Sequence, residues 1–304
     1  MENLKTSKRV AIGTLYALSA GVMWAISGTL GQIFFENYHG NALWITSMRL
    51  VIASFILLFV SFKSEPERFF DIWKDKRNYP TLFFYAIGGV LFVQLTYYLC
   101  IQHSNVATAT VIQFTGPIFI MLYMAIFKRK SPSVLALLYV FLAMFGVFLM
   151  ITHGKLDTMT ITFPALLFGV LSAVGVATYS IAPKKLLQSY SAVNLTGWGM
   201  LLAGIVMNIA QPLWRVDFKL EIVSISLALG IAVLGTAIPF LFSMKSVTYV
   251  SALVFSVASA SEPIFAAILS LILFQSQLDF LTLSSMGVII TSVLLLAREE
   301  GKVK

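Results

Sequence analysis

The chain has 304 residues, of which 59% are hydrophobic and 11% are charged, and its mean hydropathy is +0.89. A soluble domain carries roughly 45–50% apolar and about 25% charged residues, so this composition excludes a soluble enzyme and a disordered chain. The net charge is +8, but the 21 lysines and arginines are too few and too scattered for a nucleic-acid-binding surface.

Ten apolar runs are long enough to cross a bilayer as helices, which takes roughly 20 residues each. The first run follows Lys5, Lys8 and Arg9 and is too long for a cleaved signal peptide. We expect spans over 10–30, 42–62, 81–101, 106–127, 132–152, 161–182, 191–211, 222–243, 250–273 and 280–297. A membrane barrel would show alternation instead of solid apolar runs. The sequence therefore predicts an all-α integral membrane protein with ten transmembrane helices.

The distribution of lysine and arginine predicts the orientation of these spans. Seventeen of the 21 basic residues fall on one side if both termini lie in the cytoplasm, including those of the long loop 63–79. Only Lys155, Arg215 and Lys219 then fall on the outer side. Since cytoplasmic loops are enriched in lysine and arginine, we expect a multi-pass protein of the cytoplasmic membrane with both termini inside.

The two halves of the chain resemble each other. Matching residues recur in the same order, first at an offset of 153 and later at an offset of 146: Leu18-Ser19-Ala20 with Leu171-Ser172-Ala173, Ser27 with Ser180, Asn41 with Asn194, Gly89 with Gly235, Pro117-Ile118-Phe119 with Pro263-Ile264-Phe265, and Val147 with Val293. Each half, 1–152 and 153–304, would hold five spans. Because five is odd, the second repeat enters the membrane inverted, an arrangement typical of secondary transporters.

Several residues at helix depth form a further pattern: Trp24, Arg49, the stretch 105–127 with Pro117, the stretch 251–274 with Pro263, and Gly146 and Gly287. In this pattern the sequence resembles the drug/metabolite transporter superfamily, in its ten-helix EamA-type branch. The resemblance implies ten helices, cytoplasmic termini and export or exchange of small metabolites. The sequence departs from many members after the fourth and ninth helices, where Lys128-Arg129-Lys130 and Gln275-Ser276-Gln277 stand in place of Gly-Glu.

Motifs for enzymatic chemistry are missing from the sequence. It has no phosphate-binding Gly-x-x-x-x-Gly-Lys-Ser/Thr loop and no His-Glu-x-x-His, and His39, His103 and His153 all fall near the outer ends of spans. We therefore expect no catalytic residues, no cofactor and no metal. A membrane-embedded lipid-modifying enzyme is the alternative of another class, and it would need an acid–base cluster near one membrane face.

Two ionisable residues lie deep inside the predicted spans, Arg49 and Glu262. A charge at the bilayer centre costs roughly 2.5–3.5 kcal/mol on insertion scales, so such residues usually face the bundle interior and find partners. Glu262 could be a proton site or a site for a cationic substrate. The alternatives are a structural ion pair between the two residues or, for Arg49, a side chain that extends to the membrane surface.

Polar and aromatic side chains on one face of several spans predict a substrate site. Helical spacing and similar depth bring together a candidate set: Trp24, Ser27, Gln94, Tyr97, Gln113, Trp198 and Glu262. Small residues on the same faces could equally be helix-packing contacts, and aromatic residues could belong to the interfacial belt.

The expected function is a secondary active transporter that moves a small organic metabolite across the cytoplasmic membrane. Export of amino acids or related compounds is the leading expectation and rests on the family resemblance. The alternative is uptake or efflux of an organic cation, choline-like or drug-like, through an aromatic site with Glu262. The expected partners are a small-molecule substrate and the lipid bilayer, with proton or substrate antiport.

Overall fold

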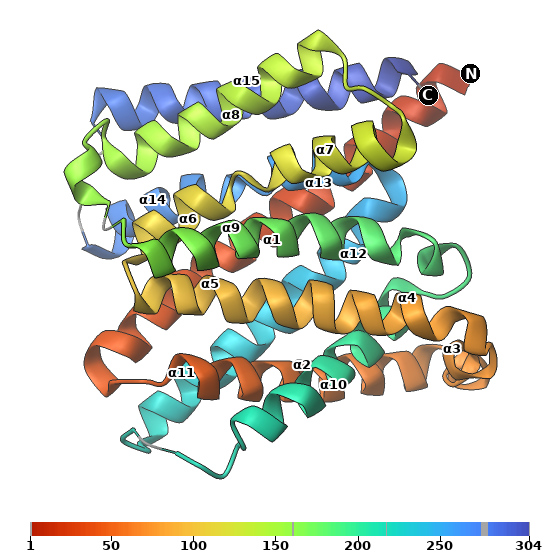
Figure 1. Ribbon diagram of the computed structural model, residues 1–304, viewed down its shortest axis with the longest axis vertical. Helices are drawn as coiled ribbons and strands as arrows, with labels where there is room; N and C mark the ends of the chain where they lie inside the picture. Colours follow the sequence, from red (N-terminus) through yellow and green to blue (C-terminus); the bar gives the residue numbers. More distant parts are fainter. Residues whose placement is uncertain (1, 160, 217, 275–278, 304) are drawn as a thin grey trace.

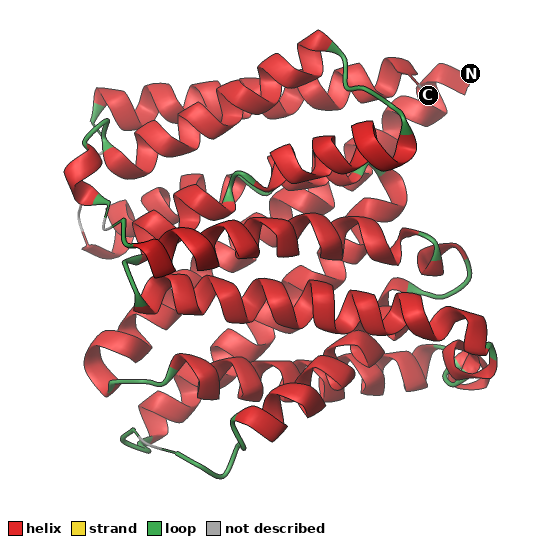
Figure 2. Cartoon of the chain, viewed as in Figure 1, coloured by secondary structure: helices red, strands yellow, loops and turns green. Residues whose placement is uncertain are grey.

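The computed structural model describes residues 2–159, 161–216, 218–274 and 279–303, so Gln275-Ser276-Gln277 lies outside the described residues. Within these ranges the chain is helical and contains no strand (Figure 2). Ten helical spans of sufficient length and apolarity coincide with the ten predicted ones. The prediction of an all-α membrane fold is confirmed.

The first half contains spans one to five. They are α1 (Glu2–Tyr38), α2 (Ala42–Ser64), α4 (Tyr79–Phe83) continued by a π-helical segment η3 (Phe84–Leu91) and α5 (Phe92–Gln102), α6 (Val106–Gln113) with α7 (Gly116–Lys128), and α8 (Val134–Thr152). The loop after α2 carries η1 (Pro66–Arg68), the short α3 (Asp71–Lys74) and η2 (Lys76–Asn78), and η4 (Leu156–Thr158) follows α8.

The second half repeats this order. Its spans are α9 (Phe163–Ile181), α10 (Ala192–Ala210), α11 (Ile222–Ala232) continued by a π-helical segment η7 (Val233–Ala237) and α12 (Ile238–Tyr249), α13 (Ala252–Ala258) with α14 (Ser261–Phe274), and α15 (Phe280–Val303). Two 3₁₀ turns, η5 (Ala182–Lys184) and η6 (Leu186–Gln188), lie between α9 and α10.

The two halves are inverted relative to each other. In Figure 1 both termini lie at the right, which we call the termini face, and the left is the opposite face. Helix α1 starts at the termini face, whereas α9 starts at the opposite face. The packing follows the same symmetry, because α1 packs on α12 and α14 while α9 packs on α5 and on α6 and α7.

Two helix pairs join the halves along the pseudo-symmetry axis. Helix α2 packs on α10 at one end of the bundle, and α8 packs on α15 at the other (Figure 1). Apolar side chains on the outside of these helices are exposed, among them Phe55 and Phe59 on α2 and Phe141 and Phe145 on α8. Exposed apolar surface of this kind suits a bilayer, where lipid covers it.

The two repeats break their fourth helix at the same place. Span four is interrupted at Phe114 and Thr115, and span nine is interrupted at Ser259 and Ala260. Each break lies just before the repeated Pro-Ile-Phe motif. Proline lacks a backbone N–H and its ring clashes with the preceding turn, which interrupts the helix there. Polar side chains such as Gln113 and Glu262 lie beside these breaks.

Polar contacts fix the loops at the two faces. At the termini face, the Glu300 carboxylate accepts hydrogen bonds from the backbone N–H and the hydroxyl of Ser251, which ties the end of α15 to the start of α13. At the opposite face, Asp279 accepts from the backbone of Thr282 at 2.8 Å and lies 3.2 Å from the His153 ring. The hydrogen bonds from Thr282, with the nearby His153, hold the pKa of the Asp279 carboxyl below its ordinary value.

Candidate functional site

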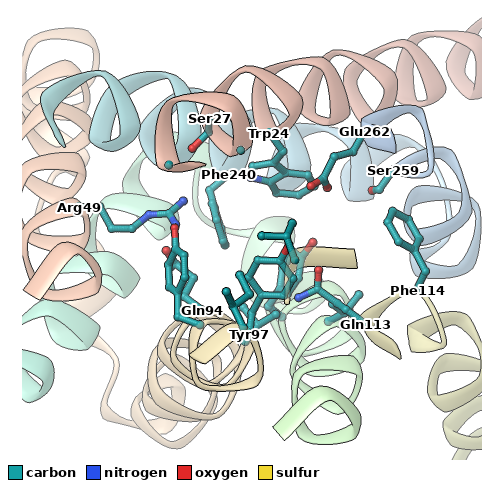
Figure 3. Close-up of a pocket in the computed structure, with 18 of the residues that line it drawn as sticks. Trp24, Ser27, Arg49, Gln94, Tyr97, Gln113, Phe114, Phe240, Ser259 and Glu262 are labelled. Atoms are coloured by element: carbon teal, nitrogen blue, oxygen red, sulfur yellow. The ribbon is translucent and has the colours of Figure 1, made fainter. Parts of the chain in front are cut away.

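A cavity of about 140 Å³ lies between the two halves of the bundle, next to both helix breaks. Its lining comes from both halves, from α1, α2, α5 and α6 of the first and from α9, α12, α13 and α14 of the second. The lining is Trp24, Ser27, Gly28, Gly31, Phe35, Arg49, Val93, Gln94, Tyr97, Tyr98, Ile101, Val106, Gln113, Phe114, Val176, Tyr179, Phe240, Ser256, Ser259 and Glu262. Figure 3 shows the labelled members facing a common space.

The cavity extends from the helix breaks toward the opposite face. Its far end is formed by Phe35, Ile101 and Val106, which lie where α1, α5 and α6 approach that face. Val106 is exposed at this end. The cavity is therefore asymmetric with respect to the membrane.

Aromatic side chains close the cavity on the side of the termini face. The Tyr179 ring lies 5.6 Å from that of Phe240 and 6.0 Å from that of Phe255. The Trp24 ring lies edge-on to Phe240 at 5.8 Å. Aromatic rings prefer such tilted and edge-to-face contacts, so the four side chains pack into one layer contributed by both halves.

Six of the seven side chains proposed from the sequence line this cavity: Trp24, Ser27, Gln94, Tyr97, Gln113 and Glu262. Their role in binding stays a prediction. Sequence reasoning left Tyr98, Phe114, Tyr179 and Phe240 out of the candidate set. Two of these could have been found, because Phe114 lies three residues before Pro117 and Tyr98 follows Gln94 by one helical turn.

Trp198 does not line the cavity, and the structure places it apart from the other six candidates. Its ring packs at the termini face against Phe69, Phe70 and Trp73, at 5.3, 5.9 and 5.3 Å between ring centres. Its indole N–H donates to the carbonyl of Phe69 at 3.2 Å. Depth along α10 placed Trp198 near the middle of the span, but the helix face turns toward the loop that follows α2.

Arg49 is buried and joins the two halves at the cavity wall. Its Nε donates to the Thr236 hydroxyl at 2.5 Å, and Nη2 donates to the carbonyl of Gly235 at 2.5 Å. Both acceptors belong to the π-helical turn η7, where the Gly235 carbonyl is available to Arg49. Nη1 donates to the Tyr98 hydroxyl at 2.6 Å.

The alternative of an ion pair between Arg49 and Glu262 is not realised in this conformation. No ion pair among the described residues joins the two, and Figure 3 shows them on opposite sides of the cavity. Arg49 also does not extend to the membrane surface, since only 6% of it is exposed.

Glu262 lies at the start of α14, directly after the helix break. Its backbone N–H donates to the carbonyl of Ser259 across the break at 2.9 Å. The side chain points into the cavity beside Trp24 (Figure 3). In the described part of the chain no hydrogen bond or ion pair to its carboxylate is found, which leaves the acid available to a ligand or a proton.

Two amide side chains differ in how they are held. The Gln113 Nε2 donates to the Ser172 hydroxyl of α9 at 2.6 Å, which links the break in span four to the other half. The Gln94 Nε2 donates to the carbonyl of Val90 at 3.2 Å. Its Oε1 is buried and has no partner among the described residues.

Known proteins resemble the chain over nearly its whole length. The model of the EamA-like transporter family matches it twice, over residues 11–152 and 163–298. An uncharacterized inner membrane transporter, YicL of Salmonella typhimurium, is 32% identical over 293 residues, 95% of this chain and 96% of that protein. The threonine/homoserine exporter RhtA of Escherichia coli is 24% identical over 275 residues, 86% of this chain and 84% of that protein.

A more distant protein and a solved structure agree with these matches. An uncharacterized transporter of Archaeoglobus fulgidus is 23% identical over 292 residues, 93% of this chain and 97% of that protein. One crystal structure superposes with a TM-score of 0.79 at 12% identity, covering 96% of this chain and 98% of that one. At such low identity that likeness concerns the fold alone. With two matches to one family model and the ten-helix inverted fold, the chain belongs to the EamA-like transporter family and is a multi-pass membrane transporter, not an enzyme.

Proposed function

We propose that the chain exports small organic metabolites by alternating access. Within this class we propose amino acids or related compounds as the substrates. The observation that carries the proposal is the cavity itself, which lies between inverted halves at two broken helices. Secondary transporters bind substrate near the midplane at the repeat interface, often beside discontinuous helices. The similarity to the threonine/homoserine exporter supports amino acids as the substrate class.

We infer that the termini face is cytoplasmic, because the basic residues concentrate on that side. The cavity then opens outward, and the aromatic layer of Trp24, Tyr179, Phe240 and Phe255 separates it from the cytoplasm. Export from this arrangement requires a second conformation in which the layer parts and the far end closes.

Glu262 is the proposed coupling residue. Its carboxylate faces the cavity at the helix break and has no protein partner in the described part of the chain. An acid placed there can hold a proton in one conformation and release it in the other, which couples transport to the proton gradient.

A second candidate function is the transport of an organic cation. Trp24, Tyr97 and Phe240 line the cavity around Glu262. Aromatic faces beside a carboxylate favour cations, and a desolvated cation–π contact contributes about 2 kcal/mol. Choline is the simplest probe of this alternative.

Reconstitution into proteoliposomes tests these proposals. We expect labelled threonine to exchange against internal unlabelled threonine, and a pH gradient to drive its accumulation. Glu262→Gln should keep the exchange and lose the accumulation. Asp279→Asn, an acid-to-amide change outside the spans, should behave like the unaltered protein. Accumulation that survives in Glu262→Gln would rule out the coupling role, and exchange of choline but of no amino acid would favour the second function.

A further inference from the structure

We propose that Arg49, Tyr98 and Gln94 form a zwitterion site that holds the carboxylate and the adjacent ammonium group of an α-amino acid. The three side chains line one wall of the cavity, from neighbouring helices α2 and α5. The inference rests on the proposed function and adds the residues that recognise the substrate, and hence its charge pattern.

The donors of this wall suit a carboxylate. Arg49 is 6% exposed, and three of its N–H groups donate to Thr236, Tyr98 and Gly235. An arginine carries five N–H groups, so two remain without a partner in the described part of the chain. The Tyr98 hydroxyl accepts from Arg49 and keeps its own proton to donate. Charge-assisted bonds from guanidinium to carboxylate are short and strong.

The acceptor of this wall suits an ammonium group. Gln94 is 5% exposed, and its Oε1 has no hydrogen-bond partner among the described residues. A buried acceptor left unpaired is costly, so a ligand that donates to it gains that energy on binding. An ammonium group is such a donor.

The spacing of donors and acceptor matches an α-amino acid. Gln94 and Tyr98 are four residues apart on α5 and therefore neighbours on one helix face. The carboxylate and ammonium of an α-amino acid are attached to one carbon, so they need a donor and an acceptor side by side. Glu262 lies across the cavity from Arg49 (Figure 3), whereas Gln94 shares helix α5 with Tyr98, the hydrogen-bond partner of Arg49.

The size of the cavity limits the side chain of the ligand. At about 140 Å³ it is similar to an engineered protein cavity of about 150 Å³ that holds benzene. The ligand is therefore a small molecule, and its side chain points toward Glu262 and the hydroxyls of Ser256 and Ser259.

Three ligands with the side chain of threonine test whether the site requires both the carboxylate and the ammonium group. L-threonine carries both charged groups, L-threoninamide lacks the carboxylate, and 2,3-dihydroxybutanoate has a hydroxyl in place of the ammonium. Binding to the purified protein is measured by calorimetry. We expect threonine to bind at least about tenfold more tightly than either analogue, because each analogue replaces a charge-assisted hydrogen bond with a weaker neutral one.

Variants test which residues bind the carboxylate and which bind the ammonium group. Tyr98→Phe should weaken threonine several-fold and threoninamide less, and Arg49→Lys should do the same if it folds. Gln94→Leu should weaken threonine and threoninamide more than dihydroxybutanoate. Tyr123→Phe is the matched control, since Tyr123 packs on Phe127 away from the cavity, and it should change no affinity.

The outcomes separate this inference from the function on which it rests. Equal losses for threonine and threoninamide in Tyr98→Phe would overturn the assignment of the carboxylate while leaving amino-acid export standing. Threoninamide binding as tightly as threonine would overturn the zwitterion site. If none of the three ligands binds and proteoliposomes exchange no amino acid, the proposed function itself is wrong.

Discussion

Arg49 shows how a buried charge is retained in the wall of the cavity. Burying an unpaired guanidinium would cost several kcal/mol, but here a hydroxyl and a carbonyl of η7 and the hydroxyl of Tyr98 accept from it. The sequence left open whether Arg49 faces the bundle interior or extends to the membrane surface. It did not indicate the acceptors, because they come from a π-helical turn nearly two hundred residues away that no hydropathy pattern reveals.

Trp198 and Trp24 form a contrasting pair at the scale of single residues. Trp198 packs in an aromatic cluster and Trp24 faces the cavity. We expect Trp198→Ala to lower the free energy of unfolding by about 3 kcal/mol and to leave ligand affinity unchanged in the folded protein. Trp24→Ala should weaken ligand binding. Thermal unfolding and calorimetry on both variants provide the comparison, and a loss of affinity in folded Trp198→Ala would place that residue in the site after all.

The sequence predicts how deep a side chain lies in its span and which helix face carries it, but it does not predict which loop or helix covers that face. Trp24, Gln94 and Gln113 were expected to converge, and they do, because spans one, three and four meet at the repeat interface. The same reasoning failed for Trp198. Its depth was estimated from span length alone, whereas the loop after α2 folds over that part of α10 and covers the ring.

At the scale of elements, the two broken helices and the two π-helical turns are the features that sequence reasoning missed. Hydropathy gives the length of an apolar run. It is the same whether the backbone hydrogen bonds of the helix are continuous or interrupted. The repeated prolines Pro117 and Pro263 mark the internal repeat in the sequence, but the expected spans 106–127 and 250–273 run through them without a break. In the structure each follows a break at which cavity residues such as Gln113 and Glu262 are positioned.

Close helix crossings depend on glycine, and Gly175 is the clearest case. A Cβ at Gly175 of α9 would lie 2.8 Å from the Cα of Val93 in α5, so the backbones would have to separate. We expect Gly175→Ala to destabilise the protein by about 1–3 kcal/mol. Gly287 of α15 has nothing within 4 Å of a Cβ, so Gly287→Ala should be neutral or stabilise by about 0.4–1 kcal/mol.

Chemical or thermal unfolding of these two glycine variants measures the difference. Only Gly175→Ala should lower the free energy of unfolding, since both substitutions remove backbone freedom from the unfolded chain but only this one meets a neighbouring backbone. Equal stabilisation by both would show that α5 and α9 do not approach as closely as described.

For the whole molecule, the inverted arrangement predicts a fixed topology. In a Cys100→Ser background, a cysteine at His153 of the opposite face should react with a membrane-impermeant maleimide added to intact cells. A cysteine at Lys130, exposed at the termini face, should react only after the membrane is permeabilised. The reverse pattern would place both termini outside and would contradict outward opening of the cavity.

The central claim is that the cavity between the halves is the substrate pathway, and Gly28 offers the most direct test. Gly28 lines the cavity, is exposed, and has nothing within 4 Å of a Cβ, so a cysteine fits there without displacing a neighbour. In purified Gly28→Cys, Cys100→Ser protein, maleimide should label the new cysteine, and the transported amino acid should slow that labelling several-fold. The same ligand should not affect labelling of a cysteine at His153. Labelling at position 28 that proceeds at one rate with and without the transported ligand would contradict the account.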